Sequence, residues 1–423
     1  MPISTTGMIS PGRMSCGSIS KSQNWRASTP MWSTNLSTTW RRARVRFAGK
    51  DIMARILYFS LDYTPHDYRF LAALAESEHE VFYVRLQRGP RQTEDRPVPA
   101  AIRQVRWSGG RSEFRWSQLP PLTLAFRRLT RRLRPDLIHA GPIQTCTFIA
   151  ALSGFHPLLT MSWGFDLMQD AERDRWQRWI TRYVLRSSDY FISDAEVTRQ
   201  KAIAFGMPAE RTRVFPWGVD LDHFRPESPR RSAGASPSTF TLFCNRAWEP
   251  RYGVDILARA FGKVAQQRAS VSLLLLNGGS QAALLRQIFE RDGVSERVTF
   301  AGQVSQRQLP RYYHLADLFI SPSYVDGSSV SLLEALACGL PCLVSDIPAN
   351  REWIQDGVNG WLFPAGDVEA LAARILQLMD DRAALERVRP AARATAEARA
   401  DWKDNSRKLL DTYAHVLTVP WRY

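Results

Sequence analysis

The chain has 423 residues and a formal net charge of +15, with 44% hydrophobic and 23% charged residues. This length favours two domains over one compact core, and the composition is that of a globular protein. The longest apolar runs, such as residues 271–276, are too short to cross a bilayer, and the five scattered cysteines indicate neither a disulfide framework nor a zinc site. This cysteine usage favours a reducing cytoplasm.

Residues 1–52 carry much of the excess positive charge. They contain eight Lys or Arg and one acid, Asp51, and so supply +7 of the total. The segment is rich in Ser and Thr and lacks apolar periodicity, so we interpret it as a disordered leader. Its acid-poor, Arg-rich character also resembles a transit peptide. We favour the alternative that translation begins at Met53, because a strand pattern follows it at once.

From residue 55 to residue 194, short β-rich runs alternate with helical patterns. The predicted strands are residues 55–61, 79–86, 135–140, 156–163 and 189–194. The predicted helices are residues 67–77, 121–134, 145–154 and 173–188. This alternation predicts a doubly wound sheet of parallel strands.

The second half repeats the alternation after a Pro-, Gly- and Ser-rich stretch at residues 216–238, the predicted linker. Its predicted strands are residues 239–245, 271–278, 297–302, 317–323 and 341–346. Its predicted helices are residues 253–267, 281–293, 306–316, 329–339 and 402–416. We therefore predict an α/β protein with two Rossmann-like domains that face a central cleft, over residues 53–215 and 239–398, and a helix within residues 399–423 that returns to the first domain.

Loops after the strands should line this cleft, because ligands of doubly wound sheets bind beyond the carboxyl ends of the strands. The candidate loops and turns are residues 64–67, 141–142, 163–166, 246–253, 277–279 and the stretch 324–341.

Three segments carry a family resemblance. They are residues 214–226 (VFPWGVDLDHFRP), Arg246 with the EPRYGVD that follows it, and residues 321–367, where Asp326 and Glu334 lie eight apart in a stretch that ends in Gly-x-Pro. Together they resemble family 4 of retaining glycosyltransferases, which have the GT-B fold. The resemblance covers residues 53–416. It implies a hexosyltransferase of cell-envelope polysaccharide synthesis that moves a sugar from a nucleotide-diphosphate donor to a glycan or lipid-linked acceptor, without a metal or other cofactor.

The turn before the predicted helix at residues 329–339 has the features of a diphosphate site. The amides of Ser328, Ser329 and Val330 and the helix dipole can bind an anion without a basic side chain. Glu334 lies off the apolar stripe of this helix, so it should avoid the core and can accept hydrogen bonds from ribose hydroxyls. By resemblance, Asp326 faces the transferred sugar.

Arg246 binds the donor diphosphate by resemblance, and its guanidinium can hold two phosphate oxygens. The family usually has a lysine where this chain has Tyr252. The group that replaces this lysine at the second phosphate is either Arg251 or the neutral hydroxyl of Tyr252, unless the position has no replacement and Arg251 is only a solvated loop residue. The predicted donor-binding residues are Arg246, Arg251, Tyr252, Gly278, Gly279, Gly327, Ser328, Ser329, Val330 and Glu334.

In the first domain, the family often has a histidine before a glycine, where this chain has Trp163 before Gly164. We expect Trp163 to stack on a sugar ring and Asp166 to hold a sugar hydroxyl. His66 is a candidate for the missing imidazole, although a single loop histidine is more often structural. The predicted acceptor-side residues are His66, Trp163 and Asp166, and the predicted catalytic residues are Asp326, Asp166 and Arg246.

The resemblance implies a front-face displacement, in which the leaving phosphate takes the acceptor proton and the protein stabilises charge on the diphosphate. A double displacement through Asp326 is the alternative. For the whole chain, the alternative function is a non-catalytic GT-B sugar-nucleotide-binding partner subunit. It is motivated by Asp326, Tyr252 and Trp163, which depart from the family pattern.

Other partners are less favoured by the sequence. Asp220 and Asp222 match the Asp-x-Asp of metal-dependent glycosyltransferases but lie in the predicted linker, so no metal site is predicted. Nucleic acid is not a predicted partner, because no recognition motif occurs and much of the excess charge lies in residues 1–52.

Residues 173–186 combine aromatic side chains with four arginines on a predicted helix. One interpretation is peripheral contact of the first domain with an anionic bilayer, at the inner face of the cell membrane. The interpretation we favour is a core helix with an arginine-rich outer side. The predicted location is the cytoplasm.

Overall fold

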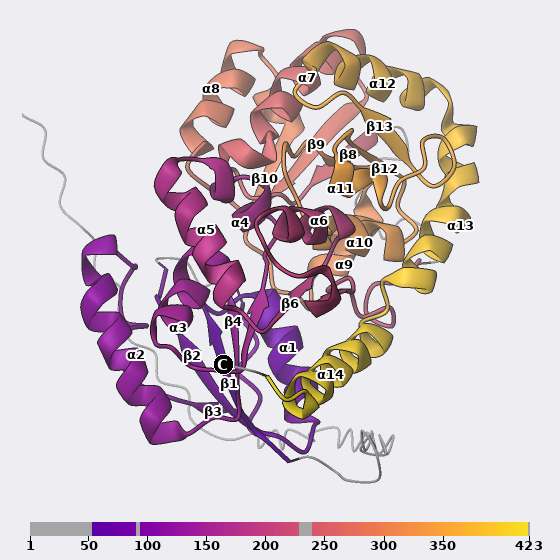
Figure 1. Ribbon diagram of the computed structural model, residues 1–423. Helices are drawn as coiled ribbons and strands as arrows, with labels where there is room; N and C mark the ends of the chain where they lie inside the picture. Colours follow the sequence, from indigo (N-terminus) through magenta and orange to yellow (C-terminus); the bar gives the residue numbers. More distant parts are fainter. Residues whose placement is uncertain (1–52, 90–93, 228–238, 422–423) are drawn as a thin grey trace, which may run out of the picture. The chain divides into compact units, whose positions relative to one another are not determined.

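The computed structural model describes residues 53–89, 94–227 and 239–421. The predicted leader at residues 1–52 lies outside these described residues, as does most of the predicted linker, residues 228–238. The described chain forms two parallel sheets, each covered by helices (Figure 1).

The amino-terminal sheet has the strand order β3-β2-β1-β4-β5-β6-β7. Its strands are β1 (Arg55–Ser60), β2 (Glu80–Arg85), β3 (Arg103–Gln104), β4 (Leu137–Gly141), β5 (Leu158–Met161), β6 (Tyr190–Ser193) and β7 (Thr212–Val214). Its helices are α1 (Pro65–Ala75), α2 (Leu119–Leu133), α3 (Phe148–Leu152), α4 (Phe165–Met168), α5 (Arg175–Ser187) and α6 (Glu196–Ala204). The strand order reverses between β1 and β4, which is where such sheets bind ligands.

The carboxyl-terminal sheet has the order β10-β9-β8-β11-β12-β13. Its strands are β8 (Phe240–Cys244), β9 (Val271–Leu276), β10 (Val298–Gly302), β11 (Leu318–Ser321), β12 (Cys342–Ser345) and β13 (Trp361–Phe363). Its helices are α7 (Val254–Gln267), α8 (Ala282–Arg291), α9 (Leu309–Leu315), α10 (Val330–Ala337), α11 (Pro348–Arg351), α12 (Val368–Asp380) and α13 (Arg382–Arg399). Here the order reverses between β8 and β11.

The central strands are buried on both faces, and this explains their continuous apolar sequences. In β1, Leu57 and Phe59 pack into one apolar cluster, whereas Ile56 and Tyr58 pack into another on the opposite face. The predicted α/β class with two doubly wound parallel sheets is confirmed. The edge strands β3, β7 and β13 were not predicted, because two or three residues are too few to show a periodic pattern.

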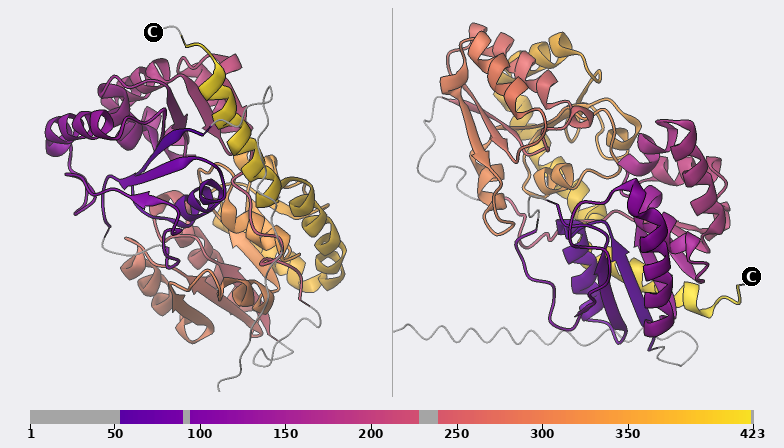
Figure 2. Two further views of the ribbon diagram at one scale, coloured as in Figure 1. Left: turned by 90° about the horizontal axis from the view of Figure 1, so that it is seen from below. Right: turned by 90° about the vertical axis from the view of Figure 1, so that its left-hand side faces the viewer.

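The last helix, α14 (Trp402–Thr418), packs on the amino-terminal sheet. Leu409 and Val416 join the apolar cluster of β1 and α1, and the Tyr413 hydroxyl lies 2.5 Å from Nδ1 of His139 in β4. The views of Figure 2 show this helix beside the amino-terminal strands. The chain therefore crosses between the domains twice, and the two crossings are joined where the Val219 amide donates to the Ala400 carbonyl at 2.8 Å.

Acidification below neutral pH is expected to destabilise the protein, in part through His139. Burial lowers the pKa of this imidazole from 6.5 to about 3. Between pH 6.5 and pH 3, this imidazole therefore binds a proton in the unfolded chain but not in the folded protein. The free energy of unfolding falls by up to about 1.4 kcal/mol per pH unit as the pH drops from 6.5 toward 3.

Urea unfolding at pH 7, 6 and 5 measures this loss. His139→Asn is expected to flatten the dependence of the unfolding free energy on pH. Tyr413→Phe, which keeps the imidazole, is expected to preserve it. An unchanged slope in the His139 variant would contradict the explanation.

Candidate active site

The turn between β11 and α10 is the centre of the candidate site. Helix α10 begins at Val330, with Ser329 at its N-cap position. Leu332, Leu333 and Leu336 are fully buried in the carboxyl-terminal core, and they fix the helix with its N-terminus at the carboxyl end of β11. The first amides of a helix have no acceptor within the helix and lie at the positive end of its dipole, so this turn can bind an anion.

Arg246 follows β8 and lies against this turn. Its guanidinium donates to Ser329 Oγ and to Asp326 Oδ2, each at 2.7 Å. Burial disfavours the charge of Arg246, but Asp326, with smaller contributions from Tyr252, Cys244 and Tyr313, offsets this effect and the pKa of Arg246 is raised. Burial likewise raises the pKa of Asp326, against the opposing effect of Arg246. Two of the predicted catalytic residues thus form a largely buried ion pair at the N-terminus of α10.

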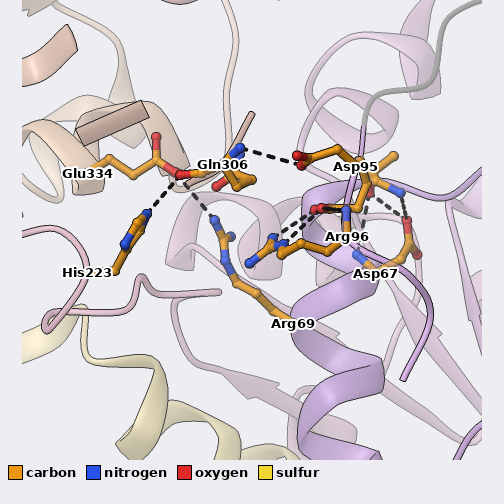
Figure 3. Close-up of polar contacts among 9 residues, drawn as sticks. Asp67, Arg69, Asp95, Arg96, His223, Gln306 and Glu334 are labelled. Atoms are coloured by element: carbon orange, nitrogen blue, oxygen red, sulfur yellow. Dashed lines mark hydrogen bonds and ion pairs between the residues drawn. The ribbon is translucent and has the colours of Figure 1, made fainter. Parts of the chain in front are cut away.

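Glu334 lies off the leucine stripe of α10, as the helical pattern predicts, yet it is only 3% exposed. The Tyr313 hydroxyl donates to its Oε2 at 2.7 Å. Arg69 of α1 donates to its Oε1 at 3.5 Å (Figure 3). Burial raises the pKa of Glu334, while Arg69 and Tyr313 oppose the rise. The sequence pattern did not reveal this burial, because Arg69 comes from the other domain.

The two domains touch at a pair of glycines. A Cβ atom on Gly164 would lie 2.5 Å from the amide nitrogen of Gly327, and one on Gly327 would lie 2.4 Å from Asp194 Oδ1. Asp194, just after β6, accepts a hydrogen bond from the Ser328 amide at 2.8 Å. In this structure the Ser328 amide, a predicted diphosphate ligand, is therefore bonded to the amino-terminal domain. The amides of Ser329 and of the residue after it begin α10.

His66 and Trp163, both predicted on the acceptor side, lie next to each other. Their ring centroids are 5.7 Å apart. Burial, followed by the charges of Arg69 and Arg246, lowers the pKa of His66 to about 3, so its imidazole is neutral at physiological pH. The candidate replacement for the missing imidazole is thus beside the tryptophan that takes the histidine's place in the sequence.

Asp166 is fully buried and organises the turn that carries Trp163. Its Oδ1 accepts hydrogen bonds from the Ser162 hydroxyl at 2.6 Å and from the amides of Trp163 and Leu167 at 3.0 Å. Its Oδ2 accepts one from the Ile143 amide at 3.1 Å. These bonds use both oxygens, so the geometry favours a positioning role over the predicted contact with a sugar hydroxyl.

Arg251 and Tyr252 both stack on neighbouring groups. The Tyr252 ring lies against Arg246, whose Cζ is 4.3 Å from the ring centroid. Arg251 Cζ is 4.7 Å from the ring of Phe165 in the amino-terminal domain. Gly278 and Gly279 pack against Trp248. The Gly278 carbonyl accepts a hydrogen bond from the Trp248 amide at 3.1 Å. A Cβ atom on Gly279 would lie 2.4 Å from the Trp248 carbonyl oxygen.

Five buried polar atoms around this turn have no hydrogen-bond partner among the described residues. They are His66 Nδ1, Arg69 Nη1, Trp163 Nε1, Asp194 Oδ1 and Arg246 Nε. Leaving such an atom unpaired costs about 1–3 kcal/mol, and folded proteins contain few of them. Their concentration at one place indicates a site for a polar ligand.

Residues 66–223 match the family described as Glycosyltransferase Family 4, and residues 239–381 match the family described as Glycosyl transferases group 1. The two matches together include the whole turn between β11 and α10, Arg246 and Trp163. The chain belongs to glycosyltransferase family 4. The resemblance noted in the sequence is thereby confirmed, and the departures at Asp326 and Tyr252 are departures within the family.

Curated relatives in this family are bacterial glycosyltransferases. A GDP-mannose-dependent alpha-(1-6)-phosphatidylinositol monomannoside mannosyltransferase of Mycobacterium tuberculosis is 30% identical, over 55% of this chain and 64% of the relative. The amylovoran biosynthesis glycosyltransferase AmsK of Erwinia amylovora is 32% identical, over 47% of this chain and 49% of the relative. The chain thus spans 64% and 49% of the lengths of these two relatives.

Solved structures share the fold at lower identity. Sucrose-phosphate synthase of Thermosynechococcus elongatus superposes with a TM-score of 0.74 at 20% identity, covering 86% of this chain and 98% of that one. HepE of Anabaena, in complex with UDP and glucose, superposes with a TM-score of 0.69 at 19% identity, covering 85% and 99%. These similarities place the two sheets in the GT-B fold.

Sequence reasoning missed two residues that contact the candidate site, Arg69 and Asp194. Arg69 interrupts an apolar stretch of α1, and Asp194 follows a buried parallel strand; these two placements were the available signals. In the Asp-x-Asp match at residues 220–222, Asp222 pairs with Lys403 of α14. Within residues 53–89, 94–227 and 239–421, no group of three or more His, Cys, Asp or Glu is placed to hold a metal ion.

Proposed function

We propose that the protein is a retaining, metal-independent hexosyltransferase that moves a sugar from a nucleotide-diphosphate donor to a glycan or lipid-linked acceptor. The observation that carries the proposal is the N-terminus of α10, with Arg246 and Asp326 bonded at its start and Glu334 one turn later. In this arrangement the Arg246 guanidinium and the first amides of α10 can bind a diphosphate, and the Glu334 carboxylate can bind the ribose that follows it in the ligand.

In this mechanism the bond between the anomeric carbon and the diphosphate oxygen breaks, and the acceptor oxygen bonds to the same face of that carbon. The acceptor proton passes to the departing phosphate oxygen. Arg246 and the first amides of α10 stabilise the negative charge that grows on the diphosphate. The ion pair of Asp326 with Arg246 lowers the nucleophilicity of this carboxylate, which favours the front-face displacement over a covalent intermediate on Asp326.

A donor screen tests the proposal. We expect one nucleoside diphosphate among UDP, GDP and ADP to raise the melting temperature, and its sugar to be consumed when an acceptor is present. GDP-mannose is the first donor to test, because the mycobacterial relative is named for it. Absence of a shift and of turnover with all three would reject the proposal.

The second candidate function is a sugar-nucleotide-binding partner subunit without activity. The observation in its favour is Tyr252, which replaces the usual lysine and stacks on Arg246 instead of offering a charge. Measurable binding of a nucleoside diphosphate, together with no donor consumption over long incubation, would favour this function.

We also propose that the amino-terminal domain binds the anionic inner surface of the cell membrane through α2 and α5. Trp176 and Trp179 of α5 are 49% and 48% exposed and stack with ring centroids 5.0 Å apart, while Ile180 and Val184 of the same helix are buried. The two helices also carry eight exposed arginines that form no ion pair with a described residue: Arg127, Arg128, Arg131 and Arg132 on α2, and Arg175, Arg178, Arg182 and Arg186 on α5. Both predictions made for this helix therefore find support in one structure, since one side joins the core and the other suits a bilayer surface.

No helix among the described residues is long and apolar enough to cross a membrane. Co-sedimentation with phosphatidylglycerol vesicles is expected to detect binding that weakens with added salt. A Trp176→Ser, Trp179→Ser double variant is expected to bind roughly tenfold more weakly, because two interfacial indoles are removed. The control is Val358→Ser, which removes a side chain of similar exposure from the other domain. Equal binding by both variants would contradict the assigned surface.

A further inference from the structure

Arg69 is a buried cation with incomplete pairing. It lies on α1, is 7% exposed, and its Nη1 has no hydrogen-bond partner among the described residues. Its one ion pair within the described part of the chain is the contact of Nη2 with Glu334 Oε1 at 3.5 Å, and Glu334 is bonded more closely to Tyr313. Burial lowers the pKa of Arg69, and Glu334 only partly offsets this effect. A guanidinium with five N–H donors is costly to bury on one long contact.

The fold directs Arg69 toward the start of α10. Thr64 and Asp67 cap α1 reciprocally, and this fixes the first turn of the helix. His66 and Arg69 are three residues apart and therefore share one face of α1. The charges of Arg69 and Arg246 both lower the pKa of His66, so the imidazole is within the field of two guanidinium groups from opposite domains. Glu334, which holds Arg69, is five residues after the N-cap of α10, about 7.5 Å along its axis.

The other charged groups around Arg69 have closer partners (Figure 3). Arg96 forms two bonds of 2.8 Å with Glu94 and stacks on the Tyr68 ring. His223 Nε2 lies 2.8 Å from the carbonyl oxygen of Gln306. Arg69 is thus the cation of this cluster that can bind a new anion without breaking a short ion pair.

A donor diphosphate requires more positive charge than Arg246 supplies. Asp326 is bonded to Arg246 at 2.7 Å and already balances its charge. Arg251 is stacked on Phe165, and Tyr252 is neutral. The amides of α10 add only about half a positive charge.

We propose that Arg69 is a diphosphate-binding residue, and that the amino-terminal domain thereby supplies the second phosphate cation that position 252 lacks. On donor binding, Arg69 exchanges its contact with Glu334 for the diphosphate, and this releases Glu334 to bind the ribose hydroxyls. The inference rests on the proposed function. It makes recognition of the diphosphate depend on the contact between the two domains.

The test compares binding of a nucleoside diphosphate and of the matching monophosphate, GDP with GMP or UDP with UMP, by isothermal titration calorimetry on the full chain. Arg69→Gln is expected to reduce the preference for the diphosphate about tenfold, and Arg69→Lys to reduce it less. Arg96→Gln is the matched control, because Arg96 stacks on Tyr68 of α1 and is already paired with Glu94, and it is expected to leave the preference unchanged. The loss in Arg69→Gln is expected to persist in a Glu334→Ala background.

Three outcomes would overturn the inference: an unchanged preference in Arg69→Gln, equal weakening of both nucleotides, or no effect once Glu334 is alanine. The last two would show that Arg69 acts only by positioning Glu334. If Arg69→Gln does not fold, the same comparison is made with Arg69→Lys. If the unmodified protein binds none of these nucleotides, the proposed function fails and not only this inference.

Discussion

Replacing Arg246 with alanine is expected to lower kcat/KM for sugar transfer by about 100- to 1,000-fold. Two effects add. The variant loses a donor pair aimed at the site of the leaving diphosphate, and it leaves Asp326 as a largely buried carboxylate without its cation. Arg246→Lys keeps the charge but not the fork that reaches Ser329 and Asp326 together, so we expect an intermediate loss of about tenfold.

Initial rates with the donor found by the nucleotide screen measure this effect. Arg286→Ala is the matched control, because Arg286 lies in the same domain and also stacks on an aromatic ring, that of Phe300 at 4.6 Å, but is exposed on α8. The control is expected to retain activity. Unimpaired turnover in a folded Arg246→Ala variant would remove Arg246 from the donor site.

The fold was largely predictable because each element depends on local sequence. The predicted strand at residues 55–61 is β1 (Arg55–Ser60), and the predicted helix at residues 329–339 is α10 (Val330–Ala337). Apolar runs and helical stripes record burial against the chain's own sheet. Strand β3 (Arg103–Gln104) was missed, because it consists of two exposed polar residues that gain strand geometry only by pairing with β2.

The site was predictable only where one domain builds it. The spacing of Asp326 and Glu334 and the position of Arg246 placed all three around one helix start, since each follows a strand of the same sheet. The contacts of Arg69 with Glu334 and of Asp194 with Ser328 depend on how two domains meet. The hydrophobic periodicity of the sequence does not indicate which residues of the two domains come into contact. The positioning role of Asp166 could not be predicted from the sequence pattern either. Its four hydrogen bonds come from three backbone amides and the Ser162 hydroxyl, which surround it only in the folded chain.

Gly164→Ala is expected to lower kcat/KM by about 10- to 100-fold and to weaken binding of the nucleoside diphosphate by less, up to about the tenfold share assigned to Arg69. The new Cβ would lie 2.5 Å from the Gly327 nitrogen and 3.0 Å from its Cα, so the strain is relieved only when the backbones of the two domains move apart. Separation of even about 1 Å misplaces the acceptor side relative to the donor. The diphosphate keeps its contacts with Arg246 and α10, which belong to one domain, and loses only the proposed contact with Arg69 of the other domain.

Gly164 also has a φ of +82°, which costs an alanine roughly 1–2 kcal/mol by itself. Gly357→Ala isolates this cost, because Gly357 has a φ of +74° and no atom within 4 Å of the added methyl. The two variants should lose similar melting temperature, and only Gly164→Ala should lose turnover. Equal activity of both would mean that the approach of Gly164 to Gly327 has no part in catalysis.

A second pair of variants tests the same approach from the other side. In Gly327→Ala the methyl would meet Asp194 Oδ1 at 2.4 Å, a side-chain atom that a further substitution can remove. The loss of kcat/KM caused by Gly327→Ala is therefore expected to be smaller in an Asp194→Ala background than in the unmodified protein. Equal losses in both backgrounds would place the cause in the α10 turn itself. A reduced loss would tie catalysis to the contact that closes the amino-terminal domain over the donor.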